Sequence, residues 1–230
     1  MGKMIDFKRP DGQGVMGYLA EPAHAAAAPG VVVIQEWWGL NAQIKGVAER
    51  YAEAGFVALV PDLYRGKSTV EAAEAEHLMT HLNFADAAGQ DVRGAVQYLK
   101  ERGTKVGVSG YCMGGALTLL AAVHVPEADA GVVFYGYPPL EYIDASKIKM
   151  PLLAHWAVDD APFPIAKVDE LETTLKAAGV NFEFHRYQAM HAFANETQVG
   201  AARLPITEYK PEAAATAWER TLYFWNKHLR

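Results

Sequence analysis

The chain has 230 residues, of which 51% are hydrophobic and 21% charged, enough to bury the core of one globular domain spanning residues 1–230. The formal net charge is -6 and no cluster of Lys or Arg occurs, so we expect no nucleic-acid partner. No apolar run approaches the roughly 20 residues of a membrane span. The N-terminus carries neither a signal-peptide pattern nor a myristoylation site, so we expect a cytoplasmic protein without a membrane partner. The single Cys excludes an internal disulfide.

Short apolar runs alternate with amphipathic stretches along the chain. We expect strands at 16–20, 30–35, 56–60, 105–109, 130–135, 151–156 and 182–187, and helices at 44–54, 90–101, 165–178 and 211–229. The alanine-rich segment 23–29 is typical of a surface loop. This order predicts an α/β fold with a mostly parallel central sheet and helices on both faces. In such sheets, sites form at the carboxyl ends of the strands.

The most informative stretch is Gly110-Tyr111-Cys112-Met113-Gly114-Gly115, directly after the strand expected at 105–109. Glycines two positions before and after a nucleophile permit the strained strand-to-helix turn, the nucleophile elbow, that exposes it. Cys112 takes the nucleophile's place at the start of a helix, where the helix dipole and free N–H groups favour a thiolate. The alternative is a tight turn in which Cys112 is only a small buried apolar residue.

A thiol nucleophile on such an elbow needs a histidine beside it and an acid behind the histidine, in the chain order nucleophile, acid, histidine. Among the histidines, His191 follows the last expected strand in a short loop. The loop after the strand at 151–156 offers Asp159 and Asp160, either of which could instead be a turn residue or a helix cap. We expect one of these two carboxylates to orient His191 and to stabilise its imidazolium.

Glu36 ends a buried strand and precedes Trp37, an unusual place for a carboxylate unless a polar group meets it. The alternative is a solvated loop residue. With Cys112 nearby, we expect Glu36 to accept a hydrogen bond from the protonated thiol in the resting protein. The backbone N–H groups of Trp37 and Met113 would form the oxyanion hole, because the residue after the nucleophile and a loop after an earlier strand supply these donors on an elbow.

Taken together, these motifs resemble those of the dienelactone hydrolases, or carboxymethylenebutenolidases, of the α/β-hydrolase superfamily. The resemblance is carried by segments 35–41, 61–64, 110–115 and 191–194, and by Asp160 with Pro164. It implies that a small lactone or ester is hydrolysed through an acyl-thiol intermediate, without a cofactor. It assigns the triad to Cys112, Asp160 and His191, and makes Glu36 the partner of the resting cysteine; Asp159 remains the alternative acid.

The chain departs from this family where the substrate carboxylate is bound. Members of the family hold that carboxylate with arginines, one directly after the His-x-Phe-Ala motif, where this chain has Asn195. A second lies in the helical region after Tyr64, yet residues 68–91 contain no arginine. The basic side chains that could substitute are Arg65, Lys67, His77 and His81. A neutral amide does not reproduce a bidentate charged grip, so we expect an ester, lactone or thioester hydrolase whose substrate differs from dienelactone.

Several side chains near the motifs are candidates to line a small, largely apolar pocket. They are Tyr64, Tyr135, Phe163 and Asn195, together with Trp37. His77 and His81 have the spacing of two zinc ligands on one helix face, but no third ligand accompanies them, so we expect a solvated face and no metal.

Other functions remain open. A ligand-sensing module could keep a hydrolase fold without catalysis, although the intact acid and histidine argue against it. A thioesterase or general carboxylesterase would use the same residues on a different substrate. A redox role lacks a resolving cysteine. We expect a monomer.

Overall fold

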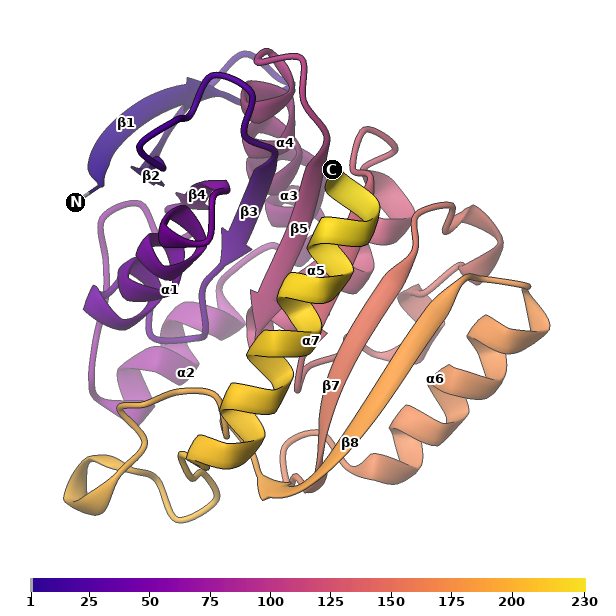
Figure 1. The fold of residues 1–230 in the computed structure, drawn as a ribbon. Helices are drawn as coiled ribbons and strands as arrows, with labels where there is room; N and C mark the ends of the chain where they lie inside the picture. The colour runs from indigo at the N-terminus through magenta and orange to yellow at the C-terminus, as the bar shows by residue number, and fades with distance from the viewer. Residues whose placement is uncertain (1) are drawn as a thin grey trace.

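The alternating apolar and amphipathic stretches fold into one eight-stranded sheet between two layers of helices in the computed structural model, which describes residues 2–230 (Figure 1). The strands are β1 (Lys3–Lys8), β2 (Gly14–Ala20), β3 (Gly30–Ile34), β4 (Val57–Pro61), β5 (Val106–Tyr111), β6 (Ala130–Phe134), β7 (Leu152–Asp159) and β8 (Phe182–Met190). Their order in the sheet is β1-β2-β4-β3-β5-β6-β7-β8. The pairings from β4 to β8 are parallel, whereas β1–β2 and β2–β4 are antiparallel.

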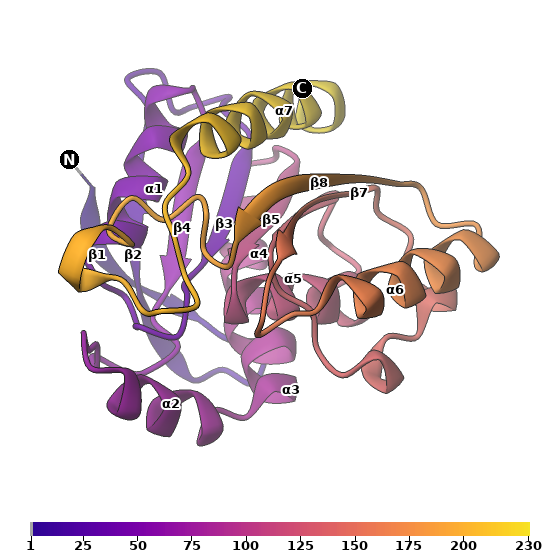
Figure 2. The ribbon, with the colours of Figure 1, turned by 90° about the horizontal axis from the view of Figure 1, so that it is seen from below.

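Helices cover both faces of this sheet, as Figure 2 shows from below. They are α1 (Ala42–Glu53), α2 (Ala72–Thr80), α3 (Phe84–Asp86), α4 (Arg93–Lys100), α5 (Met113–His124), α6 (Ile165–Ala177) and α7 (Pro211–Leu229), with the π-helix η1 (Ala87–Val92) and the 3-10 helices η2 (Leu140–Tyr142), η3 (Ala145–Lys147) and η4 (Gly200–Ala202). On β3, Val31 and Val33 pack toward α1 and α7, while Val32 and Ile34 pack toward α4 and α5. Because both faces of the strand are buried, its apolar run is continuous rather than alternating.

The expected α/β architecture is confirmed, and so are all seven expected strands and four expected helices, with shifted ends. The helix expected at 90–101 is divided, with a π-helical turn up to Val92 and α4 from Arg93 onward. Strand β1 and helix α2 were not expected. β1 is an edge strand in which only Phe7 is buried, and α2 buries only Ala75, so neither has a strong apolar pattern.

The carboxyl ends of four parallel strands lie along one edge of the sheet. β3 leads into Glu36, β5 ends one residue before Cys112, β7 ends one residue before Asp160, and β8 ends one residue before His191. The sheet therefore brings residues far apart in the chain to a common edge. Within residues 2–230, no helix combines the length and apolar composition that crossing a bilayer requires.

Candidate active site

Cys112 lies in a strained turn between β5 and α5, with φ 53° and ψ -117°. A residue with a Cβ adopts such a positive φ only where its surroundings impose it, and such residues cluster at functional sites. The Cys112 N–H donates to the Phe134 carbonyl at 3.0 Å, and the Cys112 carbonyl accepts from Gly115 N–H at 2.9 Å. The backbone therefore has the strand-to-helix corner of a nucleophile elbow.

Two glycines permit this corner because backbone approaches them too closely for any side chain. A Cβ at Gly110 would lie 1.9 Å from the Gly114 carbonyl oxygen, and a Cβ at Gly136 would lie 1.8 Å from the Cys112 carbonyl oxygen. Gly110 belongs to the sequence motif. Gly136 follows β6 and had no sequence signal, because its partner is brought to it only by the parallel pairing of β5 with β6.

His191 and Asp160 form a buried pair beside the elbow. The Nδ1 atom of His191 lies 2.7 Å from Oδ2 of Asp160, and the other carboxylate oxygen of Asp160 accepts from the Phe163 N–H at 2.8 Å. The His191 ring lies between two aromatic rings, with centroid distances of 5.2 Å to Tyr135 and 5.4 Å to Phe163. These contacts fix the ring and leave Nε2 for the thiol of Cys112.

The charges around His191 favour its protonated form. Burial alone lowers the pKa of the imidazole, but the charge of Cys112 and the hydrogen bond and charge of Asp160 raise it to about 10. A nearby negative charge stabilises a cation strongly inside a protein. The arrangement therefore suits a thiolate–imidazolium pair.

The two candidate acids, Asp159 and Asp160, have different surroundings in the structure. Asp160 is buried and meets His191. Asp159 is the last residue of β7 and is exposed. It accepts a hydrogen bond of 2.5 Å from Nε2 of Gln188, which lies on β8. Asp160 is therefore the carboxylate that is placed to orient the imidazole.

Glu36 is buried at the same site but does not make the hydrogen bond expected with the thiol. Among the described residues, two side chains donate hydrogen bonds to its carboxyl: the Tyr135 hydroxyl to Oε1 at 3.2 Å, and Nδ2 of Asn195 to Oε2 at 2.7 Å. Both oxygens are thus held by neighbours other than Cys112. Burial raises the pKa of the Glu36 carboxyl, while His191, Asn195 and Tyr135 partly counteract this.

A cavity of about 250 Å³ opens over Cys112 and His191. Its walls come from Glu36, Trp37, Trp38, Met79, Cys112, Pro162, Phe163, His191, Ala192, Gln198, Leu204, Ile206 and Thr207. Trp37 and Phe163 therefore lie where the sequence placed them. Trp37 is one expected oxyanion donor, and Met113, the other, is the first residue of α5, where an N–H group has no acceptor within its helix.

Three residues expected at the pocket wall lie behind it instead. The Tyr64 hydroxyl donates to the Met113 sulfur at 3.3 Å, and burial together with the nearby Cys112 charge raises the pKa of Tyr64. Tyr135 and Asn195 are fully buried against Glu36. The polar atoms of these three side chains hold Met113 and Glu36, so they position groups of the site without lining the cavity.

None of the described residues that line the cavity is Lys or Arg. Of the basic residues considered as substitutes for the arginine clamp, Arg65 is paired instead with Asp91, at 2.8 Å. His77 on α2 and His81, the residue directly after α2, are both exposed. No group of three or more His, Cys, Asp or Glu able to hold a metal ion occurs within the part of the chain that the structure describes. Glu36 thus shares the cavity with His191, which Asp160 already holds, and with no lysine or arginine among the described lining residues.

One part of the cavity lining was not predicted from the sequence. Gln198, Leu204, Ile206 and Thr207 come from the irregular segment between β8 and α7. This segment has no apolar periodicity, and no motif marks it. Its length was the available signal, because long irregular segments inside a compact domain are commonly functional.

A parallel sheet with a nucleophile elbow, followed in chain order by an acid and a histidine at one strand edge, defines a hydrolase of the α/β-hydrolase class. The comparisons with known proteins agree. The dienelactone hydrolase family model matches residues 15–229. "Protein usf" of Aquifex pyrophilus is 37% identical, and a "Putative carboxymethylenebutenolidase" of Aquifex aeolicus is 34% identical, each alignment covering 100% of both chains.

A solved structure from Klebsiella pneumoniae, described as a "Putative Dienelactone Hydrolase", superposes with a TM-score of 0.84 at 25% identity, covering 99% of this chain and 100% of that one. The chain belongs to the dienelactone hydrolase family, as its motifs implied. It is accordingly a hydrolase of esters or lactones.

Proposed function

We propose that this protein hydrolyses small, uncharged lactones or esters with Cys112 as its nucleophile. The observation that carries the proposal is the array of Asp160, His191 and Cys112. Asp160 and His191 are in contact at 2.7 Å, and His191 and Cys112 both line the cavity. Each member comes from the end of a different parallel strand. Such an array has the geometric roles of a nucleophile, a base and an orienting acid.

The reaction begins with the thiolate of Cys112 and the imidazolium of His191. The sulfur attacks the carbonyl carbon, a C–S bond forms, and the carbonyl electron pair moves to oxygen. The N–H groups of Trp37 and Met113 stabilise this oxyanion. As the C=O bond re-forms, the C–O bond to the leaving oxygen breaks, and Nε2 of His191 gives that oxygen its proton.

Water then cleaves the acyl-thiol intermediate. Neutral His191 accepts a proton from the water as its oxygen attacks the acyl carbon, and the C–S bond breaks to return the thiolate. The products are a carboxylic acid and an alcohol, or a single hydroxy acid when the substrate is a lactone. Asp160 holds Nδ1 throughout, so that Nε2 always faces the reacting atoms.

The preference for an uncharged substrate rests on the charges in the cavity. The lining includes the carboxyl of Glu36. None of the described lining residues is a lysine or an arginine. A carboxylate on the substrate would be desolvated here with no lysine or arginine to pair with it, and the imidazolium of His191 is already paired with Asp160 and with the thiolate of Cys112. Burying such a charge without a partner costs about 1–3 kcal/mol or more. The Asn195 amide, which replaces a charged grip, is already committed to Glu36.

The test compares kcat/KM for a neutral lactone and for the same ring carrying a carboxylate. We expect the neutral lactone to be preferred, and we expect Cys112→Ala to lower its turnover by roughly 1,000-fold or more. Cys112→Ser should also be slow, because a hydroxyl needs stronger base activation than a thiol. A strong preference for the anionic lactone, or near-full activity of Cys112→Ala, would contradict the proposal.

A further inference from the structure

A second cavity adjoins the one that contains Cys112. It measures about 350 Å³ and is lined by Trp38, Asn41, Ala42, Gln43, Thr69, Val70, Thr197, Gln198 and Ala202. Two of these residues, Trp38 and Gln198, also line the catalytic cavity. The two cavities are therefore separated only by shared side chains, and we refer to the second as the outer cavity.

The wall between the cavities is held firmly. The Trp38 carbonyl accepts from Thr69 N–H at 3.0 Å, and the ring of Trp38 packs edge-on against Trp37 at a centroid distance of 5.0 Å. Gln198 is buried, and its Oε1 accepts from the Thr207 hydroxyl at 2.7 Å. These contacts keep the two side chains in place, so the two cavities are distinct subsites that meet along Trp38 and Gln198.

The outer cavity has a chemistry of its own. Five of its lining residues carry an amide or a hydroxyl, and none of its described lining residues is charged. Part of this polarity is already used, because Asn41 Oδ1 accepts from Ile44 N–H at 3.1 Å and Gln43 Nε2 donates to Glu196 at 3.3 Å. The Asn41 NH2 group, the Gln43 carbonyl and the Thr69 O–H still have hydrogen-bonding capacity for a ligand. Such a lining suits hydroxyl, ether or amide groups without charge.

We propose that the outer cavity is a second substrate subsite, which binds an uncharged hydrogen-bonding group at the far end of an elongated ester. The inference rests on the proposed function of Cys112. The Trp37 N–H would hold the reacting carbonyl oxygen, and the next residue, Trp38, forms the wall between the cavities. The catalytic cavity alone is smaller than most ligand sites, which measure roughly 300–1,000 Å³. The rest of a longer substrate therefore reaches the outer cavity past Trp38 and Gln198.

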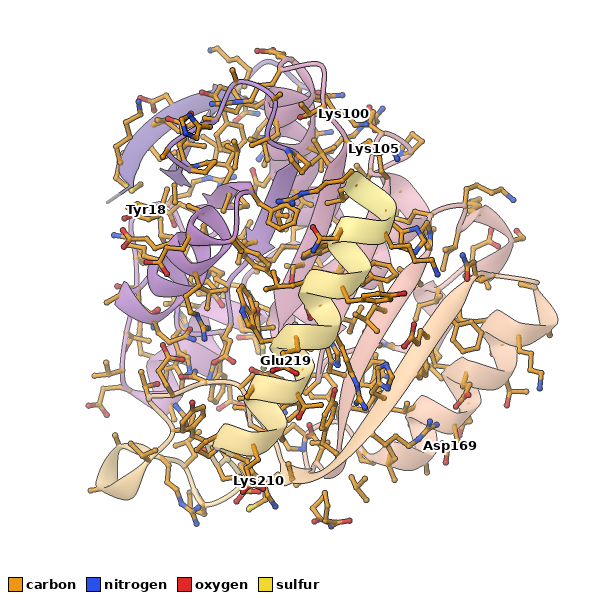
Figure 3. All side chains as sticks on the ribbon, in the orientation of Figure 1. Tyr18, Lys100, Lys105, Asp169, Lys210 and Glu219 are labelled. Carbon is orange, nitrogen blue, oxygen red and sulfur yellow. The ribbon has the colours of Figure 1, made fainter. Side chains whose placement is uncertain are left out.

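The loop between β8 and α7 forms part of the outer cavity. It runs from the end of β8 to Lys210, which is labelled at the start of α7 in Figure 3. It supplies Thr197 and Gln198 to the outer cavity, while α1 supplies Ala42 and Gln43. Ala42 is exposed and is the first residue of α1. A large side chain can therefore be placed at Ala42 to fill the outer cavity without disturbing the core.

The experiment measures kcat/KM by pH-stat for two pairs of esters. In one pair the alcohol differs, diethylene glycol monoacetate against hexyl acetate. In the other the acyl group differs, methyl 6-hydroxyhexanoate against methyl hexanoate. We expect the polar-ended ester to be favoured roughly 10-fold in at least one pair, the effect of one or two hydrogen bonds, and the pair that responds identifies which half of the substrate lies in the outer cavity.

The variant Ala42→Trp should abolish this preference while leaving hydrolysis of methyl acetate unchanged, which also reports correct folding. The matched control is Ala73→Trp, at an exposed position of α2 that lines neither cavity, and it should keep the preference. Equal rates within both pairs, or a preference that survives Ala42→Trp, would overturn the subsite. Failure of the unmodified protein to hydrolyse any of these esters would overturn the proposed function itself, and the subsite with it.

Discussion

Asn195 donates a hydrogen bond of 2.7 Å to Oε2 of Glu36, and so joins two buried residues that lie 159 positions apart in the chain. Tyr135 donates to the other carboxyl oxygen. Both donors are neutral, so neither hydrogen bond to the carboxyl is part of an ion pair. This relationship explains how the carboxyl is held at a cavity whose described lining contains no lysine or arginine.

The hydrogen bond from Asn195 should be important for stability. In Asn195→Leu, Oε2 of Glu36 stays buried and loses its closest partner, so we expect the free energy of unfolding to fall by about 1–3 kcal/mol. The pKa of Glu36 should rise further, because the Asn195 hydrogen bond lowers it. Urea denaturation at neutral pH measures the effect. The exposed Asn181→Leu serves as control, and an equal loss in both variants would contradict this account.

His155 should make the protein less stable in mild acid. It is fully buried on β7, with Nδ1 at 2.9 Å from the Tyr187 hydroxyl and Nε2 at 3.0 Å from the Thr221 hydroxyl. Burial, together with the charges of His185 and Arg220, lowers its pKa well below 6.5. The unfolded chain therefore takes up a proton that the folded protein resists, and stability falls as the pH drops below about 6.5.

The measurement for His155 is the free energy of unfolding between pH 7 and pH 5, compared with His155→Gln. Glutamine retains hydrogen-bonding atoms but does not titrate, so the variant should lose less stability across this range even if it starts lower. A slope as steep in His155→Gln as in the unmodified protein would show that another group is responsible.

His191 should make the protein less stable at alkaline pH, whereas His155 does so in mild acid. Its pKa is raised from 6.5 to about 10 in the folded protein by Cys112 and Asp160. The stabilisation is therefore fully present below about 6.5 and is lost as the pH rises toward 10. We expect the unfolding free energy of the unmodified protein to decrease from pH 7 to pH 10 more than that of His191→Gln. Parallel curves would contradict the charge pairing.

Gly110 should tolerate no side chain. In Gly110→Ala the new Cβ would meet the Gly114 carbonyl at 1.9 Å, so the elbow must shift or open. We expect a loss of about 3 kcal/mol or more in the free energy of unfolding, together with loss of turnover. Gly46→Ala is the control: its Cβ meets nothing within 4 Å, and it should gain about 0.5–1 kcal/mol from helix propensity. Thermal denaturation followed by circular dichroism compares the two.

The centre of the fold was predictable from sequence because strands β3 to β7 are buried on both faces. Continuous apolar runs such as 30–35 and 130–135 have few other interpretations when amphipathic helices separate them. β1 escaped prediction because it is an edge strand with one buried residue, and its place depends on pairing with β2. The π-helical turn at 87–92 contains the buried Asp91, which binds Arg9 and Arg65, contacts that no local pattern reveals.

The site residues were predictable only where a short stretch of sequence determines their position. The spacing of glycines around Cys112 and the loop position of His191 are two such cases. The choice of Asp160 over Asp159 depends on where β7 ends. The partners of Glu36 are Tyr135, directly after β6, and Asn195, in the loop after β8, and both are distant from Glu36 in the chain. A side chain's partner is set by tertiary packing, so residue type alone could not tell a pocket wall from the layer behind it.

The central claim is that Cys112 carries the acyl group during turnover, and trapping that intermediate tests it most directly. A neutral chromogenic acetate is mixed with excess enzyme, quenched in acid within the first turnover, and the digested protein is analysed by mass spectrometry. The account predicts a gain of one acetyl group on the peptide containing Cys112, and no such gain in Cys112→Ala. Release of chromophore with Cys112 unmodified at every quench time, or with the acetyl group on another residue, would contradict it.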